Sequence, residues 1–309
     1  MTFNRRTFIK SSVSSGAAML VTAETARAAV KNQNVVPANF SIKIMATNWG
    51  FEGSADQFCD KVKQAGYDGI EVVWPGEEVQ RKLLFEAIKT HNLDFAFLLG
   101  IWDTNDYATH FKNFEHNLHA AVATKPLYIN CHAGRDHFSF EQNKAFMDLT
   151  QRVHNETNVP IYHETHRGRI LYSAPVARTF IEKIQDLRLT LDISHWCAVH
   201  ESLLADQTET VDMALKRTDH IHARIGHPEG PQVNDPRAPE WTSALNAHLA
   251  WWDKVLEYKI GSGSSLLTFL TEFGPIDYLP SLPYTRQPVA NQWDINIFML
   301  KLLRKRYSK

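Results

Sequence analysis

The sequence predicts an α/β protein whose single domain is a (β/α)₈ barrel. From residue 41 onward, short runs of β-branched and apolar residues alternate with longer amphipathic stretches, which is the pattern of parallel strands joined by helices. The pattern completes eight cycles without an internal repeat or a Pro/Gly-rich linker. The residues after Ala28 suffice for one such barrel, which typically needs about 250 residues.

Each predicted strand is a short apolar run, and the expected strands are residues 42–46, 69–74, 95–99, 127–130, 160–164, 189–192, 220–224 and 267–272. The stretches between them have helical periodicity, and the expected helices lie near residues 54–65, 78–91, 106–123, 140–155, 175–186, 201–216, 241–258 and 291–306. Capping residues support these bounds. Ser54 can cap the start of the first helix and Gly66 its end, and Pro175 suits the first turn of the fifth helix.

Residues 1–28 predict a twin-arginine signal peptide. The pair Arg5 and Arg6 precedes a weakly apolar run, and the small-residue pattern Ala26-Arg27-Ala28 predicts cleavage after Ala28. The alternative is a basic tail that contains two arginines by chance. Residues 29–40 are then an N-terminal extension and residues 41–309 the barrel, and we expect a periplasmic or secreted protein. The apolar run is too short and too polar to span a bilayer, which needs roughly 20 apolar residues.

The charge balance predicts a small-molecule partner. Lys and Arg total 33 against 34 for Asp and Glu, so no strong field attracts nucleic acid or anionic lipid. We therefore expect no nucleic-acid partner and no membrane anchor after signal cleavage. The three widely spaced cysteines predict buried thiols and no disulfide framework.

The ends of the last four strands predict a metal site. In a (β/α)₈ barrel the active site lies at the carboxyl ends of the strands, and here those ends carry Glu164, Asp192, His222 and Glu272. Buried carboxylates that lack a positive partner are costly, so three that converge with an imidazole predict one divalent metal ion. Oxygen-rich ligands favour Mn²⁺, with Co²⁺, Mg²⁺ or Zn²⁺ as alternatives. The competing interpretation is a set of separate helix caps and ion pairs.

Side-chain alternation assigns the residues next to these ligands. His220, His222 and Arg224 share one face of their strand, which predicts that Arg224 contacts a substrate anion or hydroxyl and that His220 packs below the site. In the fifth strand Glu164 faces inward, so His163 points toward the helices and is expected to be structural.

Further candidates lie in the loops beyond the strands. His166 is expected either to face a substrate or to point away from it. Four tryptophans lie at or just beyond strand ends and could stack on a sugar ring or pack at the mouth of the barrel: Trp49, Trp74, Trp102 and Trp196. The loop of residues 226–240 is long enough to predict a functional role.

These strand ends resemble those of the xylose isomerase-like barrel superfamily, which includes ketose 3-epimerases, inosose dehydratases, hexulose-phosphate epimerases and the AP endonuclease branch. Residues 65–71, AGYDGIE, also resemble that family's entry into the second strand. The resemblance implies metal-binding roles for Glu164, Asp192, His222 and Glu272. It also implies a substrate contact for His195, in the segment DISH that begins at Asp192. His132 matches one histidine of the endonuclease branch and is a candidate for substrate binding.

The sequence departs from the family in two places. The epimerases read HxGExxR after strand seven, where this chain reads HARIGHPE over residues 222–229, which leaves the substrate and the stereochemistry open. The endonuclease branch has Asp-x-His where this chain reads VNDPR over residues 233–237. A nuclease is therefore a weaker hypothesis.

The resulting hypothesis is a metal-dependent sugar isomerase or epimerase. Glu164 and Glu272 would act as base and acid at a carbon next to a carbonyl, through a metal-stabilised enediolate. The expected substrate is an unphosphorylated keto-sugar or sugar derivative, because we expect export of the protein and find no Gly-rich phosphate loop in the sequence. A lyase or hydratase acting on 3-keto-sugars or glycosides would use the same residues, and a non-catalytic sugar or metal binder is the alternative from another class. Relatives often form dimers or tetramers, so a homo-oligomer is also expected.

Overall fold

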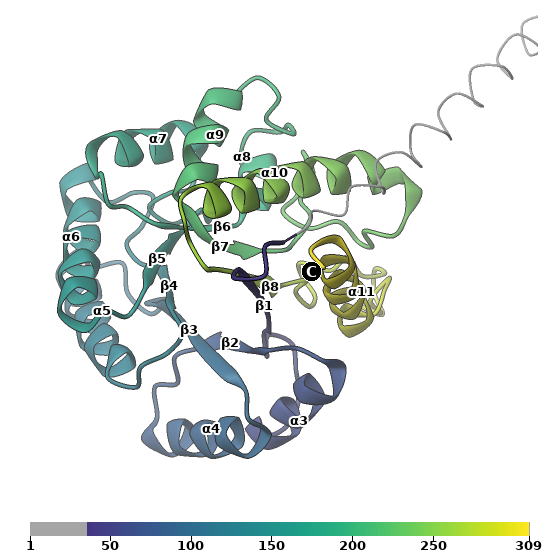
Figure 1. The fold of residues 1–309 in the computed structure, drawn as a ribbon, viewed down its shortest axis with the longest axis horizontal. Coiled ribbons are helices and arrows are strands. Elements are labelled where there is room, and N and C mark those ends of the chain that lie inside the picture. The colour runs from purple at the N-terminus through teal and green to yellow at the C-terminus, as the bar shows by residue number, and fades with distance from the viewer. Residues whose placement is uncertain (1–35, 309) are drawn as a thin grey trace, which may run out of the picture.

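A computed structural model describes residues 36–308 and contains a closed barrel of eight parallel strands in the order β1 to β8 (Figure 1). β1 pairs with β2 on one side and with β8 on the other, which closes the barrel. This arrangement confirms the predicted (β/α)₈ fold. The predicted signal peptide, residues 1–28, lies outside the described residues, as do residues 29–35 of the predicted extension.

The strands are β1 (Ser41–Ala46), β2 (Gly69–Val73), β3 (Asp94–Gly100), β4 (Ile129–His132), β5 (Ile161–Glu164), β6 (Leu189–Leu191), β7 (Thr218–His222) and β8 (Leu266–Thr271). The helices are α3 (Ala55–Ala65), α4 (Glu78–His91), α5 (Tyr107–Val122), α6 (Phe140–Thr157), α7 (Ala174–Lys183), α8 (Ile193–Val199), α9 (Thr208–Arg217), α10 (Thr242–Gly261) and α11 (Gln292–Arg306), with the 3₁₀ turn η1 (Pro239–Trp241) before α10.

Local capping explains several helix bounds. Ser54 accepts a hydrogen bond from the Gln57 backbone, and the Gln57 side chain accepts one from the Ser54 backbone, so α3 begins with a capping box. The helix ends at Gly66, whose φ of 87° is favoured by glycine. Pro175 occupies the first turn of α7, as predicted.

Three predicted elements need correction. The seventh strand, expected at residues 220–224, is β7 at Thr218–His222. The helix expected at residues 201–216 is α9, which begins only at Thr208. A short helix that was not predicted, α8, directly follows β6, and the Asp192 side chain caps it. The fourth strand was expected at residues 127–130 but runs from Ile129 to His132, since its pairing with β3 continues until His132 lies opposite Gly100. His132 therefore lies inside the strand end and not in the following loop.

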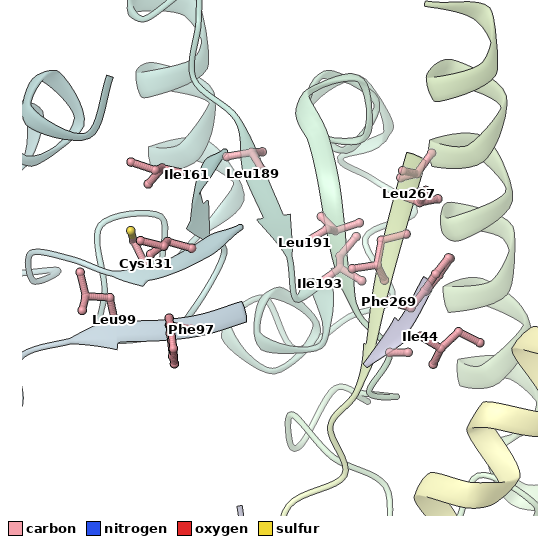
Figure 2. Packing of buried hydrophobic residues seen from close by; sticks show 14 of the residues in the cluster. Ile44, Phe97, Leu99, Cys131, Ile161, Leu189, Leu191, Ile193, Leu267 and Phe269 are labelled. Carbon is pink, nitrogen blue, oxygen red and sulfur yellow. The ribbon is translucent and has the colours of Figure 1, made fainter. Parts of the chain in front are cut away.

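The hydrophobic core lies between the outer face of the barrel and the helices. Figure 2 shows buried side chains from this layer, including Ile44, Phe97, Leu191 and Phe269, which alternate with residues that face the barrel interior. The interior holds a smaller apolar cluster of Met45, Ala96, Tyr128 and Leu270. The prediction of buried thiols is confirmed, because all three cysteines are free and buried: Cys59, Cys131 and Cys197.

Within residues 36–308, none of the helices combines the length and the apolar composition that crossing a bilayer requires.

Candidate metal centre

The structure brings the four predicted ligands together at the carboxyl ends of the strands. His222 Nδ1 lies 2.8 Å from Glu272 Oε2 and 3.7 Å from Glu164 Oε2. Asp192, His222 and Glu272 form one group whose possible ligand atoms all lie within 4.8 Å of one another. A second group within the same distance consists of Glu164, Asp192 and His195. Side chains that are 108 positions apart in the chain, from 164 to 272, thus surround one point.

These residues fit a divalent cation. Glu164 Oε1 is buried and makes no hydrogen bond, and the buried atoms Glu272 Oε2 and His222 Nδ1 have only their mutual contact at 2.8 Å. Buried polar atoms are normally satisfied, so atoms left without partners at one point indicate a missing ligand. Carboxylate oxygens with one imidazole suit Mn²⁺, Mg²⁺, Co²⁺ or Zn²⁺, and the arrangement supports the predicted metal centre.

Sequence reasoning missed Glu71 as a site residue. This glutamate lies on β2, buried in the barrel interior, and its carboxylate is 3.2 Å from His222 Nε2 and 2.9 Å from His220 Nε2. It also accepts hydrogen bonds from Tyr128 Oη at 2.7 Å and Asn130 Nδ2 at 3.2 Å. The feature of the sequence that could have identified Glu71 is an acidic residue within an otherwise apolar strand, GIEVV. Because Nε2 of His222 faces Glu71, its Nδ1 is left to face the metal position.

Opposite charges hold these buried groups in their ionised forms. Burial would raise the pKa of Glu71, but His222 and His220 hold it well below the usual value. Burial would likewise lower the pKa of His222, but Glu272, Glu164 and Glu71 raise it well above its usual value. Burial would raise the pKa of Glu164, but His132 and His222 lower it strongly.

Burial raises the pKa of Asp192 to about 6, with Arg224 opposing the shift and Glu272 adding to it. The Arg224 guanidinium is buried and donates to the Asp192 carboxylate, and its Nη2 lies 3.5 Å from Glu272 Oε2. Arg224 was expected within the seventh strand but follows β7, two residues beyond His222. It contacts two of the proposed ligands as well as facing the cavity.

Three histidines form one side of the site. His132 Nε2 lies 2.8 Å from Glu164 Oε2, and the His166 ring lies between those of His132 and His195, at centroid distances of 4.4 Å and 3.8 Å. Burial lowers the pKa of His166 and of His195 well below the usual value, so both rings are neutral. His163 points away and pairs with Thr150 of α6 at 2.8 Å, and His220 packs below His222, both as predicted.

Comparison with known proteins places the chain in a family. The family profile described as xylose isomerase-like TIM barrel matches residues 59–237, which is more than half of the chain. The chain belongs to the xylose isomerase-like TIM barrel family. A search of the curated proteins found no match.

Solved structures share the fold of this xylose isomerase-like barrel at low sequence identity. The 3-keto-D-glucoside 4-epimerase of E. coli is 15% identical with a TM-score of 0.55, over 85% of this chain and 99% of that one. The probable 3-DHS dehydratase of Bacillus anthracis is 15% identical with a TM-score of 0.54, over 86% and 100%. Endonuclease IV of Thermus thermophilus is 11% identical with a TM-score of 0.51, over 85% and 97%. At these identities the likeness establishes the fold.

A cavity of about 500 Å³ opens at the candidate metal centre of this xylose isomerase-like barrel. Its walls include five of the predicted site residues, Trp49, His132, His166, Arg224 and Glu272. Trp102 also lines the cavity, and so does Tyr278, which sequence reasoning missed because it lies in the irregular segment after β8. The Tyr278 ring is 4.9 Å from that of Trp49 and 4.9 Å from Arg224 Cζ.

The prediction that Trp196 contacts a substrate is wrong. Trp196 lies in α8, is fully buried in the hydrophobic core, and donates its Nε1 hydrogen to the Leu171 carbonyl at 2.9 Å. Because α8 starts directly after Asp192, the indole turns into the layer between strands and helices. His195, on the same helix, is also fully buried but faces the site through Arg224, whose Nη2 lies 2.8 Å from His195 Nε2.

The long loop after β7 supports the site from outside. Gln232 accepts a hydrogen bond from the Gly274 backbone at 2.7 Å and donates one to the Gly274 carbonyl at 3.2 Å. These bonds hold the chain two residues beyond Glu272. The predicted functional loop therefore lies against the segment that carries one of the ligands.

Proposed function

We propose that this protein is a divalent-metal-dependent isomerase or epimerase that removes a proton next to the carbonyl of an unphosphorylated keto-sugar or sugar derivative. The observation that carries the proposal is the pair Glu164 and Glu272. Both flank His222, with Glu272 Oε2 at 2.8 Å and Glu164 Oε2 at 3.7 Å from its Nδ1, and Glu164 Oε1 is buried without a hydrogen-bond partner.

In this proposal Glu164, Asp192, His222 and Glu272 hold one metal ion, with Mn²⁺ favoured. When bound, the ion supplies Lewis-acid polarisation of a carbonyl and stabilises negative charge. The remaining chemistry belongs to the side chains of the chain itself.

Glu164 and Glu272 are suited to exchange protons with a substrate carbon. His132 and Asn130 contact Glu164 Oε2 at 2.8 Å and 2.6 Å, which orients the carboxylate and leaves Oε1 free. Glu272 lines the cavity, so it can approach a substrate from the β8 side. A proton removed by one carboxylate and returned from the other side of the carbon gives an epimer.

The cavity walls would orient the substrate. Trp49 and Trp102 offer aromatic faces to a sugar ring, and Arg224 and His166 offer polar atoms to its hydroxyl groups. The predicted twin-arginine signal supports an unphosphorylated substrate outside the cytoplasm. The E. coli fold neighbour is named as an epimerase of a 3-keto-glucoside, a substrate of this chemical class.

Proton exchange in D₂O tests the proposal. The Mn²⁺-loaded protein is incubated with a panel of keto-sugars and 3-keto-glycosides, and products are followed by NMR. We expect deuterium at an intact carbon next to the carbonyl. Loss of water or of an alcohol with an alkene product would instead assign the protein to the lyases.

Substitution of the two carboxylates supplies the control. Glu164→Gln and Glu272→Gln should each lower the rate of exchange by roughly 10²–10⁴-fold, the usual contribution of a general acid or base. Glu141→Gln, in the first turn of α6 and exposed, should leave the rate unchanged. No exchange on any substrate by the metal-loaded wild type would favour a non-catalytic binding protein.

A further inference from the structure

Two arginines without acidic partners lie beside the cavity. Arg169 follows β5 and Arg135 follows β4. Arg169 is 8% exposed, and its Nε and Nη1 are buried without hydrogen-bond partners. The Nε of Arg135 is also buried and unpartnered, although its Nη2 donates to the Ile101 carbonyl at 3.0 Å. Among residues 36–308, neither guanidinium forms an ion pair with a carboxylate.

This arrangement is unfavourable for the protein alone. Burial, together with the nearby Arg135, lowers the pKa of Arg169 from 12.5 to about 10. A guanidinium nevertheless remains charged at neutral pH. A buried cation without a hydrogen-bonded counter-charge is destabilising, and here two cations are neighbours. A negative partner from outside the chain would remove this cost.

The two arginines lie next to residues that line the cavity. The Trp102 ring, which forms part of the cavity wall, lies 6.0 Å from Arg169 Cζ. Trp102 also contacts His132, at a centroid distance of 6.3 Å, and His132 lies 2.8 Å from Glu164. Arg169 comes three residues after His166, another residue of the cavity wall. The arginine pair is thus on the side of the cavity formed by the loops after β3, β4 and β5.

We propose that the substrate carries a carboxylate, which binds to Arg169 and Arg135 while the sugar carbons lie near Glu164 and Glu272. This inference rests on the proposed function and names its substrate class, an unphosphorylated acidic sugar. A guanidinium fork matches the two oxygens of a carboxylate. The predicted export of the protein favours a carboxylate over a phosphate.

Calorimetric titration of the Mn²⁺-loaded protein tests this inference. The ligands are D-glucuronate, D-galacturonate and D-gluconate, compared with D-glucose and D-galactose, and D-glucose 6-phosphate separates phosphate from carboxylate. We expect at least one acid to bind about tenfold or more tightly than the neutral sugars, since hydrogen bonds to charged groups are about twice as strong as neutral ones.

Arg169→Gln should abolish this preference, with a loss of about ten- to a hundredfold in affinity for the acid and little change for the neutral sugars. Arg167→Gln is the matched control. It removes the same charge from the same loop, but Arg167 is exposed and stacks on Tyr278 at 5.2 Å. If Arg169→Gln does not fold, Arg135→Gln takes its place.

Two results would overturn the inference. One is equal or absent binding of acids and neutral sugars by the wild type. The other is an equal loss of acid affinity in Arg167→Gln and Arg169→Gln, which would indicate a general electrostatic field. The titrations are repeated after chelation of the metal. Failure to bind Mn²⁺ would contradict the proposed function, whereas an acid preference that persists without metal would still support the arginine site.

Discussion

The two ring nitrogens of His222 have different neighbours, and this difference organises the site. Nδ1 faces the carboxylates of Glu272 and Glu164, and Nε2 faces Glu71 at 3.2 Å. A carboxylate on the far nitrogen of a metal-binding histidine sets its tautomer and raises its basicity. Glu71 is in turn held by Tyr128 and Asn130. We therefore expect Glu71 to be a positioning residue for the candidate metal centre.

Glu71→Gln should weaken Mn²⁺ binding by about 10–100-fold, the usual effect of removing such a partner. Competition with a fluorescent chelator measures the affinity, and the absorption bands of the Co²⁺-loaded protein report the geometry around the ion. Glu77→Gln, at the exposed start of α4, is the control. An unchanged Mn²⁺ affinity together with an unchanged Co²⁺ spectrum would refute this role for Glu71.

At the scale of elements, the site depends on how the loop after β7 packs. Gly226 lies against the start of α8, and a Cβ there would come within 2.6 Å of the Ser194 backbone. On its other side, the Gly226 N–H donates to His248 Nε2 of α10 at 3.1 Å. The absence of a side chain at Gly226 thus permits the close contact between the segments that carry Arg224 and Asp192.

Gly226→Ala should lower the free energy of unfolding by about 1–3 kcal/mol, as overpacking of a buried contact does, and should also weaken Mn²⁺ binding because Arg224 and Asp192 shift. Urea denaturation and metal titration measure the two effects. Gly261→Ala, at the end of α10 where no atom lies within 4 Å of the added Cβ, should be neutral or slightly stabilising. Similar results for both variants would count against the packing argument.

The contact between α10 and this loop should also make stability depend on pH. Burial lowers the pKa of His248 from 6.5 to about 4. The unfolded chain then binds the proton more readily than the folded protein, so stability is lost as pH falls from about 6.5 to about 4, by roughly 3 kcal/mol for a shift of this size.

His248→Gln removes this titration while keeping a side chain that can accept the Gly226 hydrogen bond. Between pH 7 and pH 4, its free energy of unfolding should fall by about 2–3 kcal/mol less than that of the wild type. Urea titrations at several pH values provide the measurement. Parallel curves for variant and wild type would show that His248 does not contribute.

At the scale of the whole molecule, closure of the barrel concentrates charge. The interior holds four buried carboxylates, Glu71, Glu164, Asp192 and Glu272, close to His220, His222 and Arg224. A cation that binds only the folded state adds to stability by mass action. Metal binding and global stability should therefore be linked.

Removal of metal by a chelator should lower Tm by several degrees relative to protein in Mn²⁺ at about 100 times its Kd, where the ion contributes about 2.7 kcal/mol. Thermal unfolding followed by circular dichroism measures the shift. Glu272→Gln, which lacks one proposed ligand, should show a smaller shift between the two conditions. A Tm that does not respond to Mn²⁺ would argue against the metal centre.

The sequence alone determined the eight-stranded architecture and most of the residues around the metal position. Strand alternation is a relation between residues i and i+2, so the inward faces of Glu164 and His222 could be predicted, as could the outward face of His163. The strand ends of a parallel barrel meet at one face, which predicted that the four ligands converge.

Only the tertiary structure decided the remaining features. The contact between Glu71 and His222 joins positions 151 residues apart, and local periodicity contains no information about such pairs. The burial of Trp196 depends on α8 starting directly after Asp192, and the neighbouring positions of Arg135 and Arg169 depend on how two separate loops fold over the barrel. Periodicity determines which way a side chain faces, whereas depth and partners depend on packing between segments distant in the chain.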